Sequence, residues 1–199
     1  MSEFGRVCTG FSCPWVALYA ESSGTVTYSS ARRLARGVKV TLNVNTSSDN
    51  KFYADNQVAE SADGVFTDGT AEFEVDGLLD ASRKMIYGLP TAVDGWYDEG
   101  DSVSVPYVGA GFIARFMSGG EASYVPYVLT KGKFATDGLE AQTQEDEISW
   151  QTTTLTLNLF RDDTSNHTWR KVGEEYTTEA AAEAAIKTFL GVTNTNTTE

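Results

Sequence analysis

The stretch VKVTLNVN, residues 38–45, alternates strictly between apolar and polar side chains. Successive side chains of an extended chain point to opposite faces, so this alternation predicts a β-strand with one buried face and one polar face. The same alternation recurs in AEFEVD (71–76) and in TLTLNLF (154–160). Three such stretches predict a mainly β protein whose sheet is apolar on its core side.

Shorter signals predict the remaining elements. Further strands are expected near residues 14–20, 51–60, 110–118, 122–134 and 167–175. The segment TTEAAAEAAIKTFLG (177–191) has a helical period instead, with Thr177 or Thr178 as its cap and Gly191 at its end. A second, short helix is predicted in LLDASRKMIYG (78–88). One flanking helix and one short helix should therefore accompany the strands.

The chain has 199 residues and a net charge of −13. We expect a flexible N-terminal arm at 1–12, a single β domain at 13–191 and a disordered tail at 192–199. The acidic balance argues against wholesale nucleic-acid binding, which requires clustered Lys and Arg. The start MSEFGRVCTG lacks the features of a secretion signal, and no apolar run approaches the roughly 20 residues that span a bilayer. Synthesis in a cytoplasm and no membrane role are therefore expected.

Charge is segregated along the chain. A basic cluster has no acidic residue among its members, which are Arg32, Arg33, Arg36 and Lys39. From Phe52 to Ser82 the chain has acidic residues but no Lys or Arg. These segments are either solvated faces or the two sides of a head-to-tail association, in which the basic docking patch meets an acidic neighbour. Complementary potentials favour register and partner choice in such contacts.

The stretch KFYADNQVAES (51–61) is the main candidate for chemistry. Asp55, Asn56 and Glu60 could supply oxygens to a metal or form an acid/base pair. Asp55 and Glu60 are five residues apart, however, and this spacing puts them on opposite faces of a regular strand. The oxygens also lack the alternating spacing of an EF-hand loop. We therefore predict no catalytic or metal-binding role for this stretch.

Other reactive side chains are few. The single histidine, His167, lies in SNHTWRKV without a catalytic signature around it. A zinc site wants about four ligands, and Cys8, Cys13 and His167 do not make up that number. Glycine-rich phosphate and dinucleotide motifs are absent from the sequence. We expect no catalytic residue, metal or cofactor, and we expect two free thiols, with a disulfide or a partner-completed site as the alternative.

The order of these motifs resembles the major tail proteins, or tail tube proteins, of bacteriophages with long non-contractile tails, notably the phi13-type family. The resemblance rests on FYADNQVAES (52–61) and VFTDGTAEFEVDGL (65–78), which lead into a short helix ending at Gly88. Three later segments also fit, namely GFIARF (111–116), YVPYVLTKGKF (124–134) and TTTLTLNLF (152–160). The resemblance covers roughly residues 10 to 190.

The resemblance implies a structural, non-enzymatic subunit with a mainly β, β-sandwich or barrel-like tail tube fold, one flanking helix and a short second helix. Such subunits assemble as hexameric rings that stack into a tube, and viral DNA passes through the lumen without specific binding. The implied partners are further copies of the chain, the tape measure protein, the tail terminator and tail-tip proteins. The implied location is the virion tail, after assembly in the host cytoplasm. The candidate inter-subunit loop comprises Phe52, Tyr53, Asp55, Asn56 and Glu60.

Electrostatics indicates which surface would line such a bore. A negatively charged surface does not retain DNA, because the phosphates find no cations against which to release counterions. The candidate lumen-facing residues are Glu72, Glu74 and Asp76, or else the polar face of 39–45.

A carbohydrate-binding or adhesin-like β-sandwich is the alternative from another class of protein. Its binding platform would consist of exposed aromatic side chains such as Trp96, Tyr97 and Tyr107. An acidic β-barrel hydrolase is a third hypothesis.

Overall fold

The computed structural model describes residues 5–47, 50–54, 56–62, 64–101, 103–136, 138 and 150–192. Over these residues the protein is mainly β, as predicted, with ten strands and two helices. The strands are β1 (Val7–Ser22), β2 (Thr25–Arg33), β3 (Gly37–Thr46), β4 (Asn50–Ala54), β5 (Gln57–Ala62), β6 (Phe66–Val75), β7 (Val108–Ser118), β8 (Glu121–Phe134), β9 (Thr153–Phe160) and β10 (Arg170–Val172). The helices are α1 (Asp80–Tyr87) and α2 (Glu179–Phe189).

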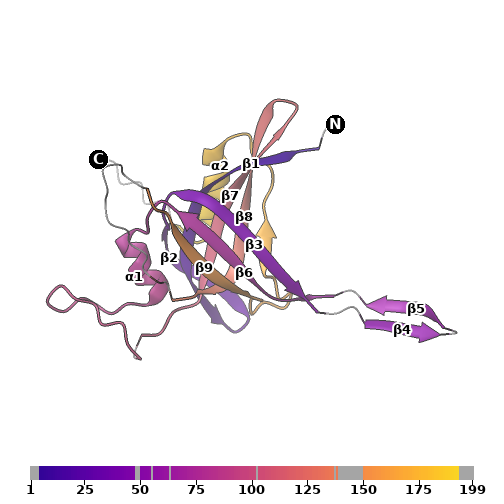
Figure 1. The fold of residues 1–199 in the computed structure, drawn as a ribbon, viewed down its shortest axis with the longest axis horizontal. Coiled ribbons are helices and arrows are strands. Elements are labelled where there is room, and N and C mark those ends of the chain that lie inside the picture. The colour runs from indigo at the N-terminus through magenta and orange to yellow at the C-terminus, as the bar shows by residue number, and fades with distance from the viewer. Residues whose placement is uncertain are drawn as a thin grey trace.

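Eight strands form one antiparallel sheet in the order β2–β1–β7–β8–β9–β6–β3, with β10 paired to β8 (Figure 1). On the side of β8 away from β7, two strands pair with it one after the other: β9 pairs with residues 131–134 and β10 with residues 127–129. The sheet is strongly curled. Phe11 of β1 occupies the place where a side chain at Gly37 of β3 would begin. The second strand of the order and the last one thus approach each other, which gives a barrel-like, incompletely closed sheet.

The main core lies on the inner side of the curl. Its fully buried side chains come from β1, β6, β7, β8, β9, α1 and the connection between β2 and β3, and the largest are Phe73, Leu34, Ile86, Leu129, Leu155, Leu157 and Leu159. The predicted alternation of 71–76 and 154–160 is confirmed, since the apolar residues of both stretches up to Leu159 are buried. In β3 it holds only in part, because Val38 and Val44 are exposed beyond the ends of the core.

Helix α2 covers the outer face of the sheet. Ala182, Ile186 and Leu190 pack there in a second cluster with side chains of β1, β7 and β8. The approach is close, since a Cβ built on Gly111 of β7 would lie 2.5 Å from Cγ2 of Ile186. The helix begins as predicted, with the Thr178 side chain accepting a hydrogen bond from the backbone of the first turn.

Four parts of the chain differ from the prediction. Residues 51–60 form two strands, because the chain reverses at Asn56, whose φ of 62° lies in the left-handed region that Asn tolerates. Strand β2 has no counterpart in the prediction, since TVTYSSARR carries little apolar alternation. Residues 7–12, assigned above to the flexible arm, pair with β7 as the first part of β1, so that boundary is wrong. The strand expected at 167–175 is limited to β10.

Two predictions concern the ends of the chain and the membrane. Of the expected tail 192–199, only Val192 lies within the described residues. Neither of the helices in the described part of the chain is long and apolar enough to cross a membrane.

Candidate assembly surfaces

Strands β4 and β5 form a separate two-stranded sheet. This hairpin follows β3 and precedes β6 in the chain, and Figure 1 shows it projecting from the body along the long axis of the molecule. Phe52 of β4 pairs with Glu60 of β5, Tyr53 lies beside Phe52 on β4, and Asn56 is exposed in the turn. Asp55 lies outside the described residues. The predicted inter-subunit loop is therefore a projecting arm.

The turn overturns one argument about the two carboxylates. Their five-residue spacing would place Asp55 and Glu60 on opposite faces only if 51–60 were one regular strand. The chain reverses at Asn56, so the spacing does not decide which faces they occupy. Glu60 belongs to the returning strand, opposite Phe52.

Two of the predicted basic docking residues brace the body of their own chain. Arg32 Nη1 donates a hydrogen bond of 2.9 Å to the carbonyl of Ala81 in α1. Arg33 Nη2 donates to Sγ of Cys13 over 3.7 Å. Arg32 therefore ties β2 to α1, and Arg33 ties β2 to β1.

The other two basic residues stand beside acidic ones. Arg36 forms an ion pair with Asp76. Desolvation opposes the charged form of Asp76, but the hydrogen bonds from Arg36 outweigh it and lower the pKa of this carboxyl. Lys39 lies opposite Glu74 in the β3–β6 ladder. The structure thus brings part of the predicted basic patch and the predicted lumen-facing residues together on one surface.

The candidate lumen residues Glu72 and Glu74 lie on the solvent side of β6, and Asp76 directly follows the last residue of this strand. Glu72 and Asp76 are exposed and Glu74 is half-buried, while Phe73 and Val75 between them are fully buried. Polar residues of 39–45 continue this surface on β3. A polar, carboxylate-bearing sheet face is present, and its place in a bore stays a prediction.

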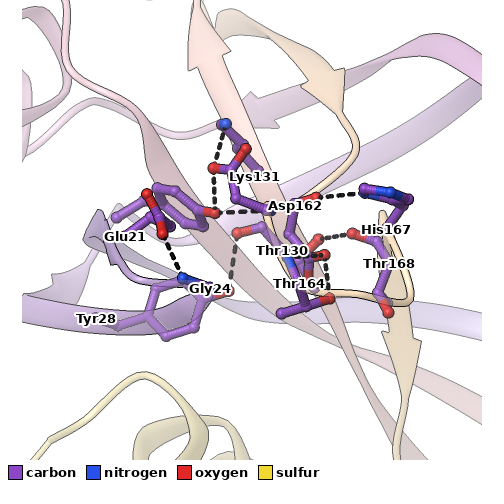
Figure 2. Close-up of polar contacts among 11 residues, drawn as sticks. Glu21, Gly24, Tyr28, Thr130, Lys131, Asp162, Thr164, His167 and Thr168 are labelled. Atoms are coloured by element: carbon purple, nitrogen blue, oxygen red, sulfur yellow. Dashed lines mark hydrogen bonds and ion pairs between the residues drawn. The ribbon is translucent and has the colours of Figure 1, made fainter.

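A polar cluster without counterpart in the sequence prediction joins β1, β2, β8 and the loop after β9 (Figure 2). Asp163 accepts a hydrogen bond of 2.7 Å from the Tyr19 hydroxyl and lies 2.6 Å from the Lys131 ammonium. The Tyr28 hydroxyl donates to the carbonyl of Thr130 at 2.8 Å. Two of these three contacts join residues that are more than 100 positions apart in the sequence. Local spacing in the sequence could therefore not reveal them.

The pKa shifts of the ionisable groups in this cluster indicate its role. Burial, reinforced by the hydrogen bond to Asp163, raises the pKa of Tyr19 to about 12. Burial also raises the pKa of Tyr28 above its usual range. The hydrogen bond from Lys131 lowers the pKa of Asp163. Neutral hydroxyls and an ionised carboxylate at neutral pH form a fixed donor–acceptor network, which is suited to holding the loop and unsuited to proton transfer.

Asp162, the neighbouring carboxylate, is only 4% exposed. It accepts hydrogen bonds from the backbone N–H and the hydroxyl of Thr164 at 3.2 and 2.6 Å. Nδ1 of His167 lies 3.4 Å from the backbone carbonyl of Asp162. Asp162 and His167 therefore shape the loop itself. A groove of about 430 Å³ beside it is lined in part by Tyr28, Lys171 and Phe189.

The groups that could support catalysis or metal binding are sparse. Within the described ranges, no three His, Cys, Asp or Glu side chains gather in a way that could hold a metal ion. Cys8 is an exposed free thiol and Cys13 a buried one. Burial, with Glu183 nearby, raises the pKa of Cys13 to about 11. Its thiol is therefore protonated at neutral pH and a poor nucleophile.

Of the three aromatic residues in the alternative sugar-binding platform, two have rings that contact other side chains, and the third, Trp96, is exposed. The Lys84 ammonium lies 4.7 Å from the centre of the Tyr97 ring. Lys131 lies 4.8 Å from the centre of the Tyr107 ring, which also packs edge-on against Phe160. Trp96 is 79% exposed in the loop between α1 and β7.

Comparison of the chain with protein-family models and with curated proteins finds no match to either. The class that the structure defines is a mainly β protein with a curled, barrel-like antiparallel sheet, one helix on its outer face, a short helix on its core, and a projecting hairpin.

Proposed function

We propose that this chain is the structural subunit of a tail tube from a bacteriophage with a long non-contractile tail. Its copies assemble into stacked rings whose bore conducts DNA. The observation that carries the proposal is the β4–β5 hairpin, which pairs with no other strand of the described residues and projects from the body (Figure 1). An isolated two-stranded hairpin is at best marginally stable in water. Packing against a neighbouring copy supplies the missing stabilisation.

The edges of the sheet support self-association. Strands β2 and β3 stand at the two ends of the strand order, and they have 9 and 10 residues. Among the described residues each has a ladder partner on one side only. Long strands of this kind tend to pair with other chains unless they are covered. Closure of a ring of subunits covers both of them.

The charge of the chain supports passage of DNA. The net charge is −13, and carboxylates occupy the solvent side of β6. Arg36 and Lys39 on the same surface lie beside Asp76 and Glu74, so phosphates would gain little counterion release there and DNA would be held only weakly.

Electron microscopy of the purified chain over a concentration series tests the proposal. We expect rings or tubes of uniform bore. A variant in which a short Gly-Ser linker replaces residues 50–62 lacks the hairpin. We expect this variant to keep the circular dichroism spectrum of the sheet and to form no stacked assemblies. A strict monomer that binds glycans would instead establish the carbohydrate-binding alternative. Tubes that form equally well without the hairpin would show that the hairpin does not mediate assembly, and the argument that carries the proposal would fail.

The basic docking patch has its own test. Arg32→Glu combined with Arg33→Glu should impair assembly if these side chains meet an acidic neighbour. Because both also brace their own chain, thermal unfolding of the variant must be measured alongside. A stably folded double variant that assembles normally would eliminate the docking role.

A further inference from the structure

A tight turn displays two large apolar side chains in the loop between α1 and β7. Val93 and Trp96 exchange backbone hydrogen bonds of 3.0 Å in both directions. Asp94 and Gly95 between them have φ of 49° and 84°, as a type I′ turn requires. Val93 is nevertheless 70% exposed and Trp96 79% exposed. A tryptophan held out on a well-defined turn is typical of an anchor residue that a partner buries.

The loop that carries this Trp96 turn (residues 93–96) is acidic and tied to α1. Between 93 and 101 it contains Asp94, Asp98, Glu99 and Asp101 but no Lys or Arg. Glu99 forms an ion pair of 2.9 Å with Arg83, and Tyr97 lies under the Lys84 ammonium. Asp94 and Asp98 flank the exposed tryptophan and are themselves exposed.

A surface of opposite character lies on β8, the end of β9 and the residue before β7. Its centre is the edge-to-face pair of Tyr107 and Phe160, whose ring centres are 5.8 Å apart and whose exposures are 43% and 38%. The ammonium groups of Lys131 and Lys133 lie 4.8 and 5.6 Å from the centre of the Tyr107 ring. We call these four residues the Tyr107 patch. Lys131 is paired with Asp163 at 2.6 Å, whereas Lys133 forms no ion pair with a residue in the described ranges. In a chain of net charge −13 the patch thus combines apolar rings with one uncompensated positive charge.

We propose that the Trp96 turn of one copy docks on the Tyr107 patch of a second copy. The exposed valine and tryptophan would cover the exposed rings, and the aspartates beside the tryptophan would face Lys133. The high exposure of Trp96 shows that it does not cover the patch of its own chain. The two surfaces differ, so the contact is head-to-tail and can repeat from copy to copy. The inference rests on the proposed self-assembly and names two surfaces that take part in it.

A second copy fits the Tyr107 patch better than a sugar does. Sugars stack on bare aromatic faces, whereas the face of Tyr107 carries lysine ammonium groups. Lys131 is already paired with Asp163, whereas the Lys133 ammonium has room for an anionic partner, which the Trp96 turn supplies through Asp94 and Asp98.

Sedimentation velocity of the full chain over a concentration series tests this contact. Trp96→Ala should weaken self-association by about 30-fold, the effect of removing an interfacial tryptophan anchor. The matched control is Trp150→Ala, which removes a tryptophan that is 87% exposed and outside the turn; it should leave self-association unchanged. Equal behaviour of the two variants, or a wild-type chain that stays monomeric throughout, would overturn the inference.

A charge exchange tests the pairing of the two surfaces. Asp98→Lys and Lys133→Glu should each weaken self-association by about 3- to 10-fold at low salt, and the combination should restore most of it. A double variant no better than the single ones would overturn the pairing. Electron microscopy of Trp96→Ala separates this inference from the proposed function. Normal tubes would overturn the docking contact alone, whereas glycan binding that is lost with Trp96 would overturn both.

Discussion

The packing of α2 on the sheet allows a quantitative prediction from one close contact. In Gly111→Ala the new Cβ would lie 2.5 Å from Cγ2 of Ile186, whereas carbon atoms in contact normally lie about 3.5 to 4.0 Å apart. The helix or the strand must shift by about 1 Å, so we expect a loss of about 1–3 kcal/mol of unfolding free energy. Ile186→Ala, at a side chain that is 1% exposed, should cost about 2–5 kcal/mol.

The double variant distinguishes the contact from general damage. Without the Ile186 side chain beyond Cβ, the atoms nearest to the new methyl group at position 111 are the Tyr127 carbonyl oxygen at 3.5 Å and the Cβ of residue 186 at 3.6 Å. Both are ordinary contacts, so the double variant should be more stable than the sum of the single losses predicts by about 1–3 kcal/mol.

Urea unfolding followed by circular dichroism measures all three variants. Gly100→Ala serves as the control for replacing glycine by alanine, because a Cβ at Gly100 meets nothing within 4 Å. Additivity of the two substitutions within about 0.5 kcal/mol would refute the predicted overlap, and so would a Gly111→Ala chain as stable as the control.

Three further predictions follow from proton affinities. Alkylation at pH 8 followed by mass spectrometry should modify Cys8 and leave Cys13 unmodified until the protein unfolds, because Cys13 is buried and its pKa is about 11; two modified cysteines in the native protein would contradict this. Absorbance titration should show that Tyr19→Phe removes one tyrosine that ionises near pH 12, and not one that ionises near pH 10. The lowered pKa of Asp163 means that its stabilising contribution is present above the ordinary carboxyl pKa near 4 and is lost as the pH falls through the lower folded value. Asp163→Asn should therefore lower stability at pH 7 more than at pH 2, by less than about 1 kcal/mol because the site is exposed; equal losses at both values would contradict it.

The sequence predicted the parts of the fold in which local period and burial agree. The apolar residues at 71–76 and 155–159 face the core because each strand has one buried face. The cap at Thr178 follows from side-chain chemistry at a helix start. Strand β2 escaped detection because its position is set by pairing with β1, and its own residues carry little alternation. Its identity as a strand depends on tertiary contacts.

The residues of the candidate surfaces could be predicted from the sequence, but their arrangement in space could not. The carboxylates of β6 were placed on the polar face by alternation alone. The neighbouring Arg36 and Lys39 come from β3, and only the ladder register brings them beside those carboxylates. The hairpin turn at Asn56 depends on a single residue in the left-handed region. A single Asn between two short apolar runs is too weak a signal to divide a predicted strand.

The second core has a consequence for biosynthesis. Its sheet side comes from β1, β7 and β8, but its other half comes from α2, which follows every strand in the chain. During synthesis, Ala17 is made long before Ala182 and Ile186, the residues that cover this face. The outer face of the sheet therefore stays open until synthesis has passed Leu190, and contacts so distant in sequence form slowly. An unfinished chain thus exposes an apolar surface that chaperones can bind. This surface is buried once α2 has been synthesised and packs on the sheet.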